Sequence, residues 1–335
     1  MCLHLKLIFK GEEKIATHGK LQHKLVDNRI FAVRTLLWGI HQLDDTSRDA
    51  WPILESGHHE FSYMIEMPLV NYPPSFYHPY VSCTYTLFAS LERPGERPFQ
   101  TQHLTLDFQP IVSLTPSILT NICPIRQKIP LPAPAFDISV VIPQQSFTVH
   151  QTPHIPIRLT MPSAVAAAWQ TQLPITVRAK LQRLIKITHT TIYQEDCTTI
   201  GRLEKAWTPS TQGPVLDLRL PLPRRHPSDP SSTLHPTMEY SKKFRIQYYV
   251  VLSVKLRPAT RLSSSTKHAV TIPIHLATLD QGTKTPAALV PFTHPEVLAD
   301  DTMLSKPRFL PPPTSHANYL PAYDPHDNPP AYILV

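Results

Sequence analysis

The sequence contains unusually little glycine. Only 8 of its 335 residues are glycine, whereas about 7% is average. None of the eight occurs at G-x-G or G-x-x-x-x-G-K spacing. Phosphate-binding loops need closely spaced glycines because the backbone amides have to approach the anion. The sequence therefore excludes nucleotide-binding folds of the Rossmann and P-loop types.

Catalytic and metal-binding patterns are also missing. The four cysteines form no C-x-x-C pair and the 18 histidines are dispersed, so we expect reduced thiols, no metal site and no cofactor. No H-E-x-x-H helix and no G-x-S-x-G elbow occurs, so we expect no enzyme. A sandwich-fold hydrolase or sugar-binding protein would need clustered carboxylates or aromatic residues, and the 25 acidic residues are not clustered.

Long apolar segments are absent too. The chain has no run of 18 apolar residues and no apolar leader, so we expect neither a membrane-spanning helix nor secretion. Its formal net charge is +7, but the basic residues are scattered and no RNA-binding signature appears, so nucleic acid is not an expected partner. An anionic cytoplasmic membrane surface is the better electrostatic partner.

Proline is abundant, with 38 residues, about twice the usual share of ~5%. High proline content disfavours helices and favours short strands with turns. Apolar residues alternate with polar ones in many segments, which is the period of half-buried strands. We therefore predict an all-β protein made of two consecutive antiparallel, immunoglobulin-like sandwiches. Segments predicted as strands lie at residues 3–10, 30–38, 61–67, 81–91, 104–108, 136–142, 155–159, 175–181, 216–222, 244–256 and 270–274.

These patterns divide the chain into four parts. We expect a first sandwich over residues 1–120, a proline-rich connector over 121–135 and a second sandwich over 136–280. Residues 163–172 form either a short helix with Ser163 as its N-cap or a long loop. Periodicity ends near Asp280, and residues 281–335 lack the apolar surface that would offset the entropy of folding, so we expect a disordered tail.

The tail holds two copies of one short pattern. Leu320, Pro321 and Tyr323 belong to the sequence LPAY, and PPAY repeats it nine residues later with Pro329, Pro330 and Tyr332. Proline-rich segments adopt an extended polyproline II ribbon, which aromatic grooves of WW domains recognise. Roughly 0.15 chance matches to Pro-Pro-x-Tyr are expected in this composition, so the repeat carries more weight than one copy. The alternative is a disordered tail with incidental tyrosines.

A second candidate surface is basic. Five cations lie on or beside strands predicted for the second sandwich, and they could face acidic peptides or phosphoinositide headgroups. The alternative is that they only solvate the outer face of the sheet. The five residues are Arg178, Lys180, Lys186, Lys242 and Lys243.

Several individually loose marks are spread over nearly the whole chain, beside the sharper tail motifs. These marks are Phe9 with Gly11, the Leu37-Trp38 pair, segments 57–69 and 72–91, the strand around Tyr248, and the strands HIPIRLTM and TIPIHL. With them the chain resembles the arrestin superfamily, specifically the fungal alpha-arrestins or arrestin-related trafficking adaptors. The family usually has further strands before the segment that resembles residues 3–11. Either the sequence is truncated there or the domain is short, which would leave an unpaired edge strand.

The resemblance implies an adaptor. The folded body would bind cytosolic segments of membrane transporters or receptors, and the tail would recruit a WW-domain HECT-type ubiquitin ligase that leads to cargo ubiquitination and endocytosis. Such a protein would be cytoplasmic and peripheral at the plasma membrane or endosomes. The alternative is a trafficking scaffold of the retromer-subunit kind that works without ubiquitin.

Overall fold

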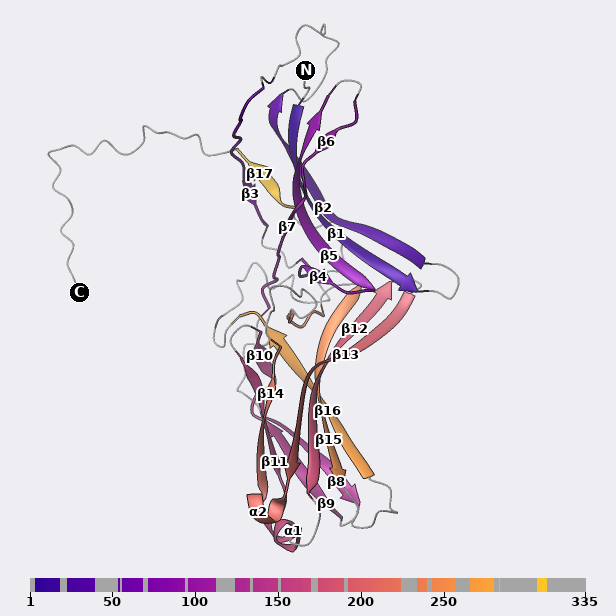
Figure 1. The fold of residues 1–335 in the computed structure, drawn as a ribbon, viewed down its shortest axis with the longest axis vertical. Coiled ribbons are helices and arrows are strands. Elements are labelled where there is room, and N and C mark those ends of the chain that lie inside the picture. Colours follow the sequence, from indigo (N-terminus) through magenta and orange to yellow (C-terminus); the bar gives the residue numbers. More distant parts are fainter. Residues whose placement is uncertain are drawn as a thin grey trace, which may run out of the picture.

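The computed structural model consists mostly of β-strands, and its shape is elongated (Figure 1). The predicted all-β class is confirmed. Within the part of the chain that the structure describes, two short helices interrupt the strands, α1 (Ser163–Ala168) and α2 (Pro209–Gln212). The structure describes residues 4–18, 23–39, 54, 56–68, 72–93, 96–112, 124–132, 135–149, 152–169, 174–189, 192–223, 234–239, 243–256, 266–279, 283 and 306–311.

The N-terminal part is organised around one antiparallel sheet with the order β2-β1-β5-β4. Along β1 (His4–His18) the odd-numbered positions Leu7 and Phe9 are buried, while the even-numbered positions from Lys6 to Ala16 are only half-buried. The predicted alternation of the strand at 81–91 is confirmed from Val81 to Leu87, but beyond it Phe88 and Ser90 are buried and Ala89 and Leu91 only half-buried. The other strands of this sheet are β2 (His23–Gly39), β4 (Phe76–Tyr77), β5 (Val81–Glu92), β6 (Phe99–Gln100) and β7 (Leu104–Leu106).

Aromatic rings form the core of this N-terminal part. The Phe31 ring lies 4.9 Å from the Phe9 ring and 5.1 Å from the Tyr72 ring, measured between centroids. Gly11 lies beneath this cluster, where a Cβ atom would come within 2.9 Å of ring atoms of Phe31 and Tyr85. Any larger residue at position 11 would therefore displace the Phe31 and Tyr85 rings from their positions over β1.

The C-terminal part contains two sheets that share one core (Figure 1). Their orders are β10-β16-β15-β12-β13 and β14-β11-β9-β8. All described pairs are antiparallel except β10 with β16, which is parallel, so the expectation of purely antiparallel sheets needs this correction. The strands are β8 (Ile125–Pro132), β9 (Ala135–Ile142), β10 (Ser146–Thr148), β11 (His154–Thr160), β12 (Ile175–His189), β13 (Ile192–Trp207), β14 (Val215–Pro221), β15 (Phe244–Leu256) and β16 (Thr266–Ala277).

Two local expectations differ from the structure. Most of the expected 121–135 connector is strand β8, which pairs with β9 along its whole length. Its prolines are tolerated because β8 is an edge strand, where a missing N–H donor breaks no ladder. The short helix at 163–168 does form, but Ser163 is its first residue, and Pro162 takes the cap position without a side-chain hydrogen bond.

A third difference concerns the tail. Within the segment that we expected to be disordered, Arg308–Leu310 form strand β17, which pairs antiparallel with β3 (Met64–Glu66) in the N-terminal part (Figure 1). A three-residue strand flanked by prolines carries too little periodicity to be recognised. Its partner also lies 242 residues away in the sequence.

Candidate functional site

The two predicted WW-binding motifs lie outside the described residues. The structure does describe the segment that leads to them, because residues 306–311 end nine residues before Leu320. The candidate site is therefore the tail together with the place where β17 attaches to the N-terminal part.

Strand β17 attaches through three kinds of contact. Its backbone pairs Leu310 with Met64, while the Arg308 guanidinium donates to the Glu66 carboxylate. This guanidinium holds the pKa of the Glu66 carboxyl below its usual value. Phe309 is half-buried and packs against the aromatic core of the N-terminal part, and Pro307 is buried. Side-chain packing, backbone pairing and the ion pair therefore all favour the alignment in which Leu310 of β17 lies opposite Met64 of β3.

The predicted basic face is only partly assembled. Arg178, Lys180 and Lys186 do share the outer face of β12. However, Arg178 bonds to Glu204 at 2.9 Å and Lys186 bonds to Glu195 at 3.1 Å, both carboxylates lying on neighbouring β13. Lys180 forms no ion pair with any other residue that the structure describes. Lys242 lies outside the described residues, and Lys243 points elsewhere.

Lys243 instead belongs to the junction between the N- and C-terminal parts. We use "junction" for Glu13, Phe76 and His78 together with Arg183, Asp196 and Lys243. The Lys243 Nζ lies 3.3 Å from the Glu13 Oε2, and the Glu13 side chain is only 5% exposed. Glu13 continues the inward-facing positions of β1, so its carboxylate is carried into the interior by the strand itself. A buried charge of this kind requires a partner, and Lys243 supplies it.

Histidine and arginine complete the junction. His78 Nε2 lies 3.1 Å from Asp196 Oδ2, and the Tyr80 backbone N–H donates to His78 Nδ1. Together these two contacts fit the neutral ring with its proton on Nε2. Arg183, 7% exposed, lies over the Phe76 ring at 5.8 Å. The hydrophobic core also continues across the junction, because Phe76 stacks 6.0 Å from Phe244.

The two parts are also joined at the ends of their strands. Thr278 Oγ1 donates to the Pro110 carbonyl at 2.9 Å and accepts from the Val112 amide at 2.8 Å. The junction and its surroundings therefore combine apolar stacking, the Glu13–Lys243 ion pair, the His78–Asp196 contact and hydrogen bonds from the Thr278 side chain to the backbone.

We predict that the junction weakens in acid because of His78. Burial lowers the pKa of His78, an effect that Asp196 opposes and that Arg183 reinforces. Between this lowered value and the ordinary value near 6.5, the unfolded chain binds the proton more strongly than the folded protein does. The free energy of unfolding should therefore fall as pH drops below about 6.5, by at most about 1.4 kcal/mol per pH unit.

Thermal unfolding at pH 7.5 and 5.5 measures this effect. The His78→Gln variant should lose less stability between the two pH values than the wild type. His58→Gln is the matched control, because the His58 side chain is 88% exposed. Equal pH dependence in wild type and His78→Gln would show that His78 does not titrate as described.

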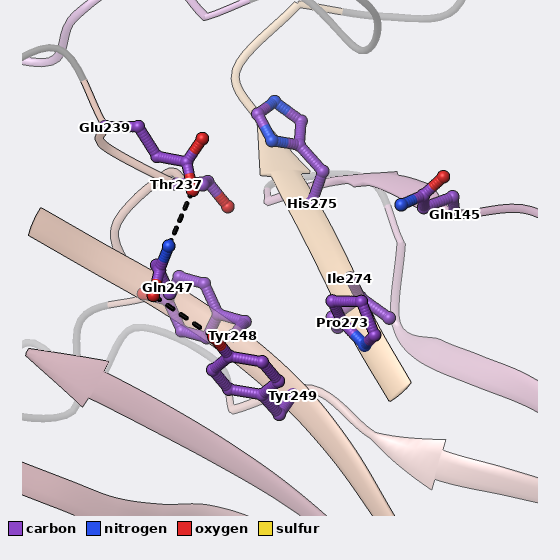
Figure 2. Close-up of a pocket in the computed structure, with 9 residues that line it drawn as sticks. All are labelled: Gln145, Thr237, Glu239, Gln247, Tyr248, Tyr249, Pro273, Ile274 and His275. Carbon is purple, nitrogen blue, oxygen red and sulfur yellow. Dashed lines mark hydrogen bonds between the residues drawn. The ribbon is translucent and has the colours of Figure 1, made fainter. Parts of the chain in front are cut away.

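A small polar pocket of about 160 Å³ lies beside β15 and β16 (Figure 2). The Gln247 amide donates to the Glu239 carboxylate at 2.8 Å, and the Tyr249 hydroxyl donates to Gln247 Oε1 at 3.1 Å. These polar groups thus satisfy one another. No sequence-predicted site residue lines the pocket, whose walls are Gln145, Thr237, Glu239, Gln247, Tyr248, Tyr249, Pro273, Ile274 and His275.

The described residues contain no group of three or more histidine, cysteine or acidic side chains placed to hold a metal ion. None of their helices has the length and apolar character needed to cross a membrane. Cys83 is a free thiol inside the core, where burial raises its pKa well above the ordinary value.

The junction was missed at the level of sequence, although a signal existed. Glu13 interrupts the apolar series of Leu7, Phe9 and Ile15 at an inward-facing position. Arg183 likewise interrupts the inward-facing series of β12. A charge in the buried phase of a clean alternation indicates an internal partner.

Comparisons with known proteins add no assignment to this geometry. Neither the scan against protein-family models nor the search of curated proteins finds a match for this chain. The arrestin resemblance therefore stays a prediction from the sequence.

Proposed function

We propose that the protein is a non-enzymatic adaptor of arrestin-like fold. Its tail binds a WW-domain HECT-type ubiquitin ligase, and its folded body binds a cytosolic segment of a membrane transporter or receptor. The ligase is thereby concentrated at the client, which is ubiquitinated and internalised. The protein works in the cytoplasm, at the surface of the plasma membrane or endosomes, and needs no cofactor.

The repeated Pro-x-Tyr pattern carries this proposal. Tyr323 and Tyr332 are nine residues apart, which corresponds to about 28 Å in a polyproline II ribbon. Two tethered WW domains bound at that separation gain avidity because the second binding event is intramolecular. Composition supports the same conclusion, since proline rings hold the ligand extended before it binds.

Long strand edges support the client-binding half of the proposal. In the described part of the chain, β2 pairs only with β1, and β13 pairs only with β12. An extended client segment can add to such an edge through main-chain hydrogen bonds, with side-chain pockets giving specificity. Arg178 and Lys186 on the outer face of β12 are already paired with carboxylates, so this face is a weaker candidate for binding an anionic membrane or an acidic client. We therefore assign the client to a strand edge.

Removing residues 312–335 tests the ligase-binding half. We expect the full chain to bind a tandem of WW domains from a HECT-type ligase and the shortened chain, which keeps β17, to show no measurable binding by calorimetry. Matching thermal unfolding of the two chains is the control for intact folding. Undiminished binding by the shortened chain would refute the tail as the site. If client sorting in cells also survives the deletion, a ubiquitin-independent scaffold is the function.

A further inference from the structure

The attachment of β17 has a geometric consequence for the tail. Leu279 ends the last described segment of the C-terminal part, and Leu320 follows it by 41 residues. Fully extended, such a tether reaches about 140 Å. Leu320 follows Leu310 by only ten residues, which span about 34 Å at most. Pairing of β17 with β3 therefore shortens the tether of the first motif roughly fourfold.

The attachment of β17 also means that the tail starts from the N-terminal part instead of from the end of the C-terminal part. Strand β17 lies beside β3 and close to β2, both of which belong to the N-terminal part (Figure 1). The effective concentration of a tethered group falls about as the −3/2 power of tether length. Shortening the tether of the first motif from 41 to ten residues therefore raises the effective concentration of that motif near the attachment point about eightfold.

We propose that β17 is a clamp that anchors the tail on the N-terminal part ten residues before the first Pro-x-Tyr motif, so that a WW-domain ligase bound to the tail acts from that side of the molecule. This inference rests on the proposed function, because it places the same tail site. The clamp itself, however, stands on the strand pairing, on Phe309 in the aromatic core and on the Arg308–Glu66 ion pair.

Disulfide trapping tests the clamp without any ligase. Met64 and Leu310 are direct cross-strand partners, and such pairs have Cβ atoms about 4.5–5.5 Å apart. Met64→Cys with Leu310→Cys should close under mild oxidation in the full chain. The matched control is Met64→Cys with Lys306→Cys, which is four residues out of register and about 13 Å away, beyond the reach of a disulfide. Peptide mapping distinguishes the new bond from the native cysteines.

Charge reversal tests what holds the clamp closed. Glu66→Arg and Arg308→Glu each place like charges opposite one another and should slow the trapping of the 64–310 pair. The double variant exchanges the two charges and should restore the wild-type rate. Both side chains are exposed, at 44% and 72%, so these changes leave the core intact.

Cross-linking of a bound WW tandem to lysines of the full chain tests the positioning. We expect cross-links in the clamped protein to favour Lys6, Lys10 and Lys14 of the N-terminal part. Glu66→Arg weakens one of the three contacts and should therefore reduce that preference, by at most the eightfold change expected for complete release, and the charge-exchanged double variant should restore it.

The outcomes separate the two proposals. Equal trapping of the in-register and out-of-register pairs overturns the clamp, whatever the ligase does. Trapping without any WW binding leaves the clamp standing and overturns the adaptor function. A cross-link pattern that Glu66→Arg does not change shows that β17 pairs with β3 but does not position the ligase.

Discussion

Replacing both Tyr323 and Tyr332 by alanine is expected to abolish binding of a tandem WW protein to the full chain. Each tyrosine is the aromatic residue of its motif, and it fills the pocket next to the groove that holds the proline rings. Without the two rings, the remaining proline segments offer only weak stacking. The binding should therefore fall to the background measured with a chain that ends at residue 311.

The single variants are expected to show how the two motifs cooperate. If both motifs bind one ligase together, Tyr323→Ala or Tyr332→Ala alone should weaken binding by about 100-fold or more, since avidity of this size is lost with either partner. If each motif acts alone, each single variant should lose only about half of the binding sites and keep the same affinity. Isothermal calorimetry separates the two cases, because it measures both stoichiometry and dissociation constant.

A third tyrosine in the tail supplies the control. Tyr319 lies immediately before the first motif but follows alanine and asparagine, not proline. Tyr319→Ala should therefore leave the affinity unchanged. An effect as large as that of Tyr323→Ala would mean that aromatic content, and not the Pro-x-Tyr pattern, binds the WW domain.

The strands that the sequence predicted well are those with one face in the core. Along β15, Phe244, Ile246 and Tyr248 alternate with outward-facing residues and are at most 1% exposed. On β5, Val81 and Tyr85 follow the same rule. Burial of one face imposes a two-residue period on the sequence, so the pattern and the structure have one cause.

The strands that it missed carry no such constraint. Most described side chains of β13 are exposed or half-buried, because this strand lies at a sheet edge. Strand β8 is an edge strand interrupted by Pro130, and β17 is only three residues long. The junction was missed for a different reason. Glu13 and Arg183 do mark buried charges in the sequence, but the pairing of Glu13 with Lys243 arises only from the packing of the two parts, which no local pattern records.

The junction also limits how the proposed adaptor can respond to its partners. Phe76 extends from the N-terminal part into the core of the C-terminal part, while Thr278 ties the ends of both. A client on one part and a ligase clamped to the other would therefore be held at a defined separation. The buried ion pair is the contact whose loss should disturb this arrangement most.

Lys243→Met is accordingly expected to cost about 3–5 kcal/mol of stability, because it leaves the Glu13 carboxylate buried without its cation. For a structure of this size the melting temperature should fall by roughly 6–20 °C. Thermal unfolding followed by circular dichroism measures the loss. Arg178→Met is the matched control, since the Arg178–Glu204 pair is more exposed and removal of its cation should cost less than about 1 kcal/mol.

The double variant Glu13→Leu with Lys243→Met separates charge from packing. Replacing a buried ion pair by apolar side chains of similar volume is often neutral or stabilising, so the double variant should recover most of the stability that Lys243→Met loses. Simple addition of the two single effects would indicate that the side chains do not interact. Recovery would instead identify the unpaired carboxylate as the cause. It would also mean that the pair contributes little net stability, so that its contribution to the junction would be to disfavour other arrangements of the two parts, in which a charge is buried alone.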